Sequence, residues 1–111
     1  TMGYNLELEK KLVPYAKKWG DLAGKKMFGG IGYLRNGNMA FGIYQDSLIL
    51  RLAEAKSVLA LQVPEIKPAD IAGRPMKGWV MMSPGGWRDG TLLGKWLKLA
   101  YEYAGSLPAK S

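Results

Sequence analysis

The sequence contains no cysteine and no histidine among its 111 residues. Without cysteine the chain can form no disulfide bond, ligate no iron–sulfur cluster through thiolates and use no thiolate nucleophile. Without histidine it lacks the usual general base at neutral pH, the commonest metal ligand and the usual pH switch. These absences exclude histidine-dependent serine proteases, zinc hydrolases and haem proteins with histidine ligation. We therefore expect a protein that is not an enzyme and that binds no metal or cofactor.

Long hydrophobic runs are also missing, and so is a signal-peptide pattern at the first residues. No segment approaches the roughly 18 uncharged apolar residues that span a bilayer, because even Leu48–Leu52 contains Arg51. Apolar residues make up 48% of the sequence, which is ordinary for a soluble globular domain. We expect one domain, residues 1–111, without a membrane partner.

Acidic residues are few compared with basic ones. Nine Asp and Glu residues stand against sixteen Lys and Arg residues, which gives a formal net charge of +7. Such a charge attracts nucleic acid, an anionic membrane surface or an acidic protein. The basic residues are spread along the chain without an arginine-rich arm, so charge alone does not choose among these partners. The acidic residues stand mostly at turns and helix starts, which indicates caps rather than a paired-carboxylate site.

The first predicted element is a helix from about Asn5 to Trp19, with Asn5 as its N-cap. Its apolar residues share one face, because they recur at intervals of three or four. They are Leu8, Leu12, Tyr15 and Trp19. Pro14 removes one helical hydrogen bond, so we expect a kink or a two-part helix there.

Three strands are predicted to follow, over Met27–Leu34, Met39–Gln45 and Leu48–Leu52. The first two flank Asn36-Gly37, a dipeptide that tolerates positive φ at both central positions of a type I′ hairpin turn. Alternation in the second strand directs three side chains to the core: Met39, Phe41 and Ile43. Glycines in strands cost stability, so we expect bulges, a bent sheet, or close approach of a helix or second subunit to offset them. They are Gly29, Gly30, Gly32 and Gly42.

The second half of the chain is expected to contain a helix, two strands and a last helix. These elements span Ala53–Gln62, Ile66–Ile71, Met76–Met82, and the segment from just after Asp89 or Thr91 to about Gly105. Ser83-Pro84-Gly85-Gly86 is expected to end the second of these strands. The order helix, three strands, helix, two strands, helix predicts an α+β fold, with a mainly antiparallel sheet covered by helices on one side.

Two segments match known binding motifs only in part. Gly20–Lys26 has three residues between its glycines, where the Walker phosphate-binding motif needs four. Lys26–Tyr33 resembles the strand with which RNA-recognition domains stack on bases, but Gly30 stands where the central aromatic belongs. We therefore expect packing, rather than nucleotide or RNA chemistry, from these glycine-rich segments.

Basic and aromatic residues come together best where Arg74 and Lys77 flank a turn next to Trp79. This arrangement fits a contact with an anion, but ordinary surface charge at a turn explains it better. Trp87 lies between a glycine and an arginine, so we expect it to be the most exposed tryptophan.

Four further segments follow one another in order: Lys25–Gly30, Asn36–Gly42, Leu48–Arg51 and Gly73–Trp79. Together they resemble the N-terminal domain family of TfoX, a bacterial regulator of natural competence, and the resemblance covers nearly the whole chain. It implies an α+β domain of the secretion-chaperone-like type, with the same order of elements. It also implies a cytoplasmic bacterial protein, commonly a homodimer, and it offers no catalytic residues.

The resemblance shapes the functional prediction. TfoX is a positive regulator of competence genes, thought to act with the cyclic-AMP receptor protein, and it carries a further C-terminal domain. This chain is therefore predicted to be a stand-alone, non-enzymatic regulatory or protein-interaction domain, with transcription machinery or a regulator as partner. The alternative is a nucleic-acid-binding accessory protein with a basic surface. The candidate interaction surface comprises Lys25, Lys26, Arg35, Arg74, Lys77, Trp79 and Trp87.

Overall fold

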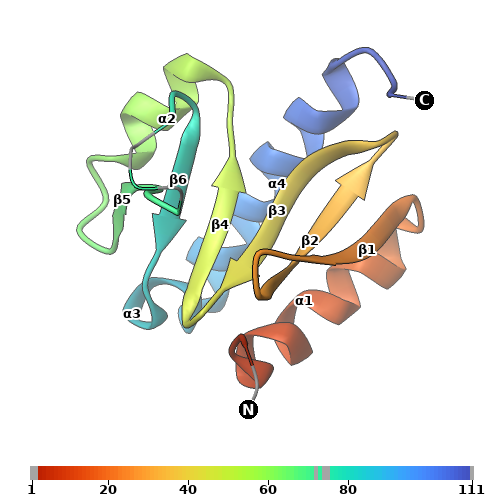
Figure 1. Cartoon of the computed structure of the whole chain (residues 1–111). Coiled ribbons are helices and arrows are strands. Elements are labelled where there is room, and N and C mark those ends of the chain that lie inside the picture. Colours follow the sequence, from red (N-terminus) through yellow and green to blue (C-terminus); the bar gives the residue numbers. More distant parts are fainter. Residues whose placement is uncertain (1–2, 72, 74–75, 111) are drawn as a thin grey trace.

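The computed structural model describes residues 3–71, 73 and 76–110 (Figure 1). Its helices and strands follow one another as α1 (Leu6–Trp19), β1 (Leu22–Met27), β2 (Gly30–Arg35), β3 (Asn38–Tyr44), β4 (Ser47–Arg51), α2 (Glu54–Ala60), β5 (Ile66–Pro68), β6 (Trp79–Met82), α3 (Pro84–Trp87) and α4 (Gly90–Ser106). The predicted α+β fold is confirmed. Within these residues, β1 and the short helix α3 are additions to the elements expected from the sequence.

The described strands form one sheet in the order β1-β2-β3-β4-β6-β5, in which all neighbours are antiparallel. Helices α1 and α4 lie behind the sheet in Figure 1, whereas no helix crosses the face turned to the viewer. The main core lies between the sheet and these helices, because both bury their apolar faces there. Its fully buried side chains include Leu8, Leu12, Phe41, Leu50, Leu97 and Ala100.

Both long helices begin at the caps that the sequence predicts. Asn5 Oδ1 accepts a hydrogen bond from the backbone N–H of Leu8 at 2.9 Å. Asp89 Oδ1 accepts from two N–H groups of the following turn, at 3.1 and 3.2 Å. These bonds satisfy N–H groups that have no partner inside the helix. The helix α1 continues through Pro14 as one element of 14 residues, so the expected division into two parts is wrong.

β1 is a strand that the sequence pattern does not indicate. The predicted strand Met27–Leu34 is interrupted by a tight turn, in which Phe28 and Gly29 have φ angles of 52° and 75°. β1 and β2 pair as a hairpin across this turn. Phenylalanine is uncommon at positive φ, so the turn signal of Gly29-Gly30 does not reveal that Phe28 is the first residue of the turn.

A β-bulge reverses the side on which Met39 lies. The register places Tyr33 opposite Phe41 but Leu34 opposite Met39, which inserts Ala40 as an extra residue in β3. Phe41 faces the helices, as the alternation predicts. Met39, predicted to join it in the core, instead packs with the cluster on the other face of the sheet.

Trp87 is fully buried, so its predicted exposure is wrong. The segment expected to be a simple break forms α3, with Pro84 in its first turn, a position that suits proline. This helix turns the indole ring inward, where Nε1–H donates to the carbonyl oxygen of Asp46 at 2.8 Å. The ring thereby joins α3 to the turn between β3 and β4.

Two strand glycines are neighbours across the sheet, since Gly32 of β2 pairs with Gly42 of β3. A Cβ atom on Gly32 would lie 3.0 Å from the methyl carbon of Met27, and one on Gly42 would lie 2.8 Å from that of Met39. The two methionines thus fill the space that larger strand residues would take. Close packing of this kind offsets the cost of glycine in a strand.

Candidate interaction surfaces

The sheet face turned away from α1 and α4, which we call the open face, is crossed by no helix among the described residues (Figure 1). Side chains alternate between the two faces of a sheet, and one row of paired residues crosses the open face from edge to edge. The row consists of Lys25, Gly32, Gly42, Ile49, Met81 and Lys67. It has a lysine at each edge and small or apolar residues between them. The segment after β5 covers part of this face, where Ala69 and Ile71 pack near Ile49.

The open face contains an apolar groove of about 250 Å³, which we call the methionine groove. Met27, Met39 and Met76 line it from three separate parts of the chain, together with Ile49 and Trp79. Flexible thioether side chains adapt to the shape of what they contact. The groove is therefore suited to an apolar partner, because its methionine side chains can change conformation to fit the partner's surface.

Phe28 stands at the lip of the methionine groove, in the turn between β1 and β2. Its side chain is 79% exposed, and its backbone has a φ of 52°. A bulky residue in the left-handed region costs on the order of 1–3 kcal/mol, and an exposed ring recovers little of this by burial. Phenylalanine at this position therefore does not stabilise the fold of the single chain.

Positive charge borders the methionine groove. Lys25 lies two residues before Met27 on the same face of β1, and the guanidinium carbon of Arg51 lies 5.3 Å from the ring centroid of Trp79. No acidic side chain lines the groove among the described residues. Most carboxylates instead accept hydrogen bonds elsewhere in the fold, namely those of Glu7, Glu9, Asp21, Asp46, Glu65 and Asp89. The groove is thus apolar with a positive border.

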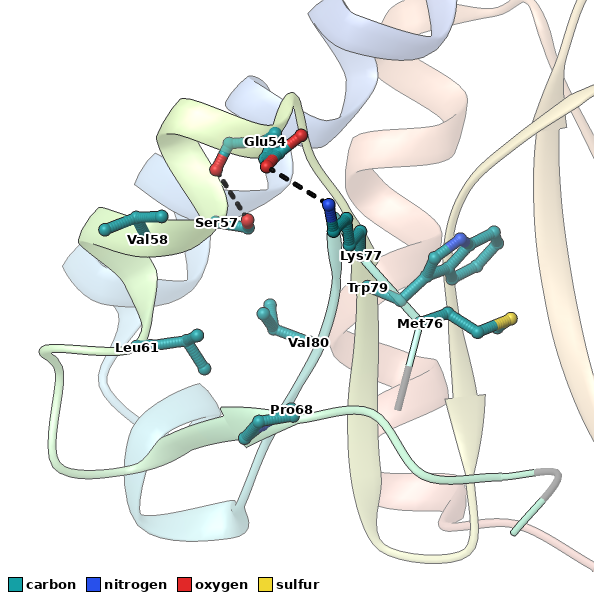
Figure 2. Close-up of a pocket in the computed structure, with 10 residues that line it drawn as sticks. Glu54, Ser57, Val58, Leu61, Pro68, Met76, Lys77, Trp79 and Val80 are labelled. Carbon is teal, nitrogen blue, oxygen red and sulfur yellow. Dashed lines mark hydrogen bonds and ion pairs between the residues drawn. The ribbon is translucent and has the colours of Figure 1, made fainter. Parts of the chain in front are cut away.

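A second hollow, of about 270 Å³, lies between α2, β5 and β6 (Figure 2). Val58 of α2 and Leu61, the residue that follows this helix, border it together with Pro68. Val58 and Leu59 of α2 and the adjoining Leu61 are 56%, 52% and 42% exposed, which is much apolar surface for a segment of eight residues. We call these three residues and the hollow beside them the α2 surface.

An acid and a base stand at the border of the α2 surface (Figure 2). Glu54 Oε1 lies 4.0 Å from Lys77 Nζ, and the two side chains are 70% and 87% exposed. An exposed ion pair of this kind contributes little to the stability of the single chain. Both charges therefore remain available to a partner.

Arg35, a predicted contact residue, is held within the fold. Its Nε donates to Asp21 Oδ2 at 3.0 Å, its Nη1 donates to the carbonyl oxygen of Tyr101 at 3.1 Å, and its guanidinium carbon lies 3.9 Å from the Tyr101 ring centroid. The Tyr101 hydroxyl donates to Asp21 Oδ1 at 2.7 Å. This hydrogen bond, followed by that from Arg35, lowers the pKa of Asp21, and the same bond raises the pKa of Tyr101. The three residues join the sheet to α4.

The basic residues chosen from the sequence do not form one patch among the described residues. Lys25 and Lys26 lie on the edge strand β1, whereas Lys77 precedes β6. The strands β1 and β6 are four positions apart in the sheet, which is about 19 Å at the usual strand spacing. Arg35 is engaged with Asp21, and Arg74 lies outside the described residues.

Sequence reasoning did not select Phe28, the groove methionines or the exposed residues of α2. The methionines come from distant segments that only strand pairing brings together. One signal was present, because paired glycines at Gly32 and Gly42 leave room that flexible side chains can fill. Trp79, which was selected, does line the groove.

Comparison with known proteins adds the family. A family model described as "TfoX N-terminal domain" matches residues 15–104, a range that contains both surfaces. Searches of curated proteins and of solved structures found no match. Over the described part of the chain, no group of three or more acidic side chains could hold a metal ion. No helix there is long and apolar enough to cross a membrane.

Proposed function

We propose, because this chain belongs to the TfoX N-terminal domain family, that it is a non-enzymatic regulatory domain that acts by binding other proteins. The resemblance to a regulator of competence genes supports a role in transcriptional regulation, in the cytoplasm of a bacterium. The side-chain inventory supports a role without catalysis, because the sequence offers no histidine or cysteine as base or nucleophile.

The α2 surface is the observation that carries this proposal. Val58 and Leu61 both border the hollow, and these two residues and Leu59 are each about half exposed. Contiguous exposed apolar patches on soluble proteins commonly mark sites of interaction. Because the exposed side chains of this surface are apolar, binding there would bury apolar area. This favours a protein partner over a nucleic acid, whose phosphates bind to basic side chains.

We further propose that the α2 surface joins two copies of the chain in a homodimer. In a twofold interface each patch meets the same patch of the other copy. Glu54 and Lys77 lie beside each other at its border, so the axis would bring Glu54 of each copy to Lys77 of the other. Val58 and Leu61 would then be buried near the centre. The surface is thus self-complementary in both charge and polarity.

A charge exchange tests this contact. Glu54→Lys places like charges together across the interface, so we expect the dimer to weaken by at least about tenfold. Glu54→Lys combined with Lys77→Glu restores opposite charges in exchanged positions and is expected to restore the dimer. Sedimentation velocity over a concentration series measures the fraction of dimer in each variant.

Glu102→Lys is the matched control, because it makes the same charge change at an exposed position of α4. It is expected to leave the dimer unchanged. Equal weakening by Glu102→Lys and Glu54→Lys, or failure of the exchanged pair to restore association, would show that the α2 surface is not the contact.

A further inference from the structure

We propose that the methionine groove binds an acidic amphipathic helix of a second protein, with Phe28 as the anchor of the contact. This inference rests on the proposed function, because it gives the partner chemistry of a domain that acts by binding proteins. The groove and the hollow of the α2 surface share Met76 and Trp79 in their linings, but Phe28, Met27 and Met39 line the groove alone. In Figure 2, Trp79 and Met76 of the groove point to the side of β6 away from α2.

The architecture of the sheet favours a helix as occupant. An apolar sheet face is stabilised when another layer of secondary structure covers it, and α1 and α4 cover the opposite face. Methionine-lined grooves suit the apolar side of an amphipathic helix because their side chains can repack. The methyl groups of Met27 and Met39 lie over Gly32 and Gly42, so their movement would open space down to the backbone of the sheet.

Phe28 has the properties of a binding anchor rather than of a folding residue. It combines a left-handed backbone, with φ of 52°, and a ring that is 79% exposed. Strained backbone positions gather at functional sites, where the strain is compensated by what the residue does. An aromatic ring at the edge of a groove is also the kind of side chain that dominates binding energy in protein interfaces.

Charge complementarity selects an acidic helix. Lys25 and Arg51 border the groove, and no carboxylate lines it among the described residues. Asp70, on the segment after β5, lines a separate hollow beside Lys67. Glutamates on the flanks of an apolar helix stripe would therefore meet cations that have few acidic neighbours of their own.

The same features disfavour the other occupants. A second copy would bring Lys25 and Arg51 against their equivalents in a chain of net charge +7. A single-stranded nucleic acid needs several rings on which bases stack. Phe28 is the exposed ring of the groove lining, whereas Tyr44 and Trp79 are half-buried, and Arg51 lies over the face of Trp79.

Synthetic peptides test the proposal. The probe is a fluorescently labelled amphipathic helix of about 20 residues, about 30 Å long, which matches the 34 Å extent of the domain. It carries leucines at i, i+3, i+4 and i+7 and glutamates on both flanks. The comparison probes are a scrambled peptide of the same composition, a version with lysine in place of glutamate, and oligothymidylate. Fluorescence anisotropy with the wild-type chain is expected to show binding to the acidic amphipathic peptide at least about tenfold tighter than to any other probe.

Two variants separate binding from folding. Phe28→Asn places in the turn a residue that tolerates positive φ, so the melting temperature is expected to stay or rise while peptide binding weakens at least about thirtyfold. Lys25→Glu is expected to weaken binding through loss of charge complementarity. Val13→Asn and Lys10→Glu, both at exposed positions of α1, are the matched controls and are expected to leave binding unchanged.

Four results would overturn the inference. Equal binding of the scrambled peptide, or equal effects of Lys25→Glu and Lys10→Glu, would show general charge attraction. Binding of oligothymidylate that Phe28→Asn abolishes would assign the groove to single-stranded nucleic acid. If the chain forms the dimer but does not bind the peptide, this inference is wrong and the homodimer stands. If the chain is monomeric but binds the peptide, the homodimer is wrong and this inference stands.

Discussion

At the scale of single residues, the backbone conformation of a turn decides which substitutions it tolerates. Asn36 and Gly37 have φ angles of 53° and 81°, which confirms the predicted hairpin turn. A Cβ atom on Gly37 would also lie 2.8 Å from the Cβ atom of Lys110 and 2.9 Å from its carbonyl oxygen. We therefore expect Gly37→Val to lower the free energy of unfolding by about 1–3 kcal/mol, measured by urea unfolding.

Gly20→Val is the matched control for this prediction. Gly20 also has a positive φ, 79°, but no atom lies within 4 Å of the position of its Cβ. Gly20→Val should strain the backbone without contacting Lys110. We therefore expect it to lower the free energy of unfolding less than Gly37→Val does. If Gly37→Val unfolded at the same urea concentration as the wild type, our account of the turn would be wrong.

The type of residue alone predicts the backbone conformation or burial at some of these turns but not at others. The turn at Asn36-Gly37 was predictable because both residues tolerate positive φ. Phe28 was not, because its φ of 52° runs against the preference of its residue type. Trp87 was placed on the surface from its polar and glycine neighbours, but burial of its ring depends on α3 and on the distant acceptor at Asp46.

At the scale of elements, hydrogen bonds connect the start of the sheet to α4. They join Asp21, which precedes β1, and Arg35 of β2 to Tyr101 of α4. The hydrogen bond from Tyr101 and then that from Arg35 lower the pKa of Asp21 in the folded chain. The ionised carboxylate thus stabilises the fold at neutral pH, and this contribution is lost as the pH falls from about 4 through the lowered pKa. Tyr101→Phe removes the donor and keeps the ring, which stacks on Trp19 with centroids 4.1 Å apart.

We expect Tyr101→Phe to be less stable than the wild type at neutral pH and to approach it at about pH 3. Urea unfolding at both pH values measures this difference. Tyr103→Phe, on the same helix, removes a hydroxyl without such a partner, and its effect should not depend on pH. A Tyr101→Phe deficit that stays the same at both pH values would contradict the role given to Asp21.

Elements were predictable where the chain carries its own start signals. The caps at Asn5 and Asp89 lie within one turn of the helices they begin, so local sequence suffices to find them. The strand β1 has four exposed residues in a row, so it shows no apolar alternation, and its pairing with β2 depends on the turn at Phe28. The bulge at Ala40 likewise depends on the register of two strands, which composition does not reveal.

At the scale of the whole molecule, the sequence predicts the fold class and the helix-covered side but not the chemistry of the opposite face. The methionine groove joins Met27, Met39 and Met76, which are adjacent only after the sheet has formed. The excess of basic residues was visible from composition. The structure adds that most acidic side chains accept hydrogen bonds elsewhere in the fold, which leaves the border of the groove positive.

The measurement that tests our central claim most directly is sedimentation equilibrium of the wild-type chain at about 0.15 M and about 1 M salt. A protein-interaction domain that dimerises through Val58, Leu59 and Leu61 is expected to show twice the mass of one chain at both salt concentrations, because apolar burial does not depend on charge screening. A single-chain mass at every concentration and in both salts would contradict the account.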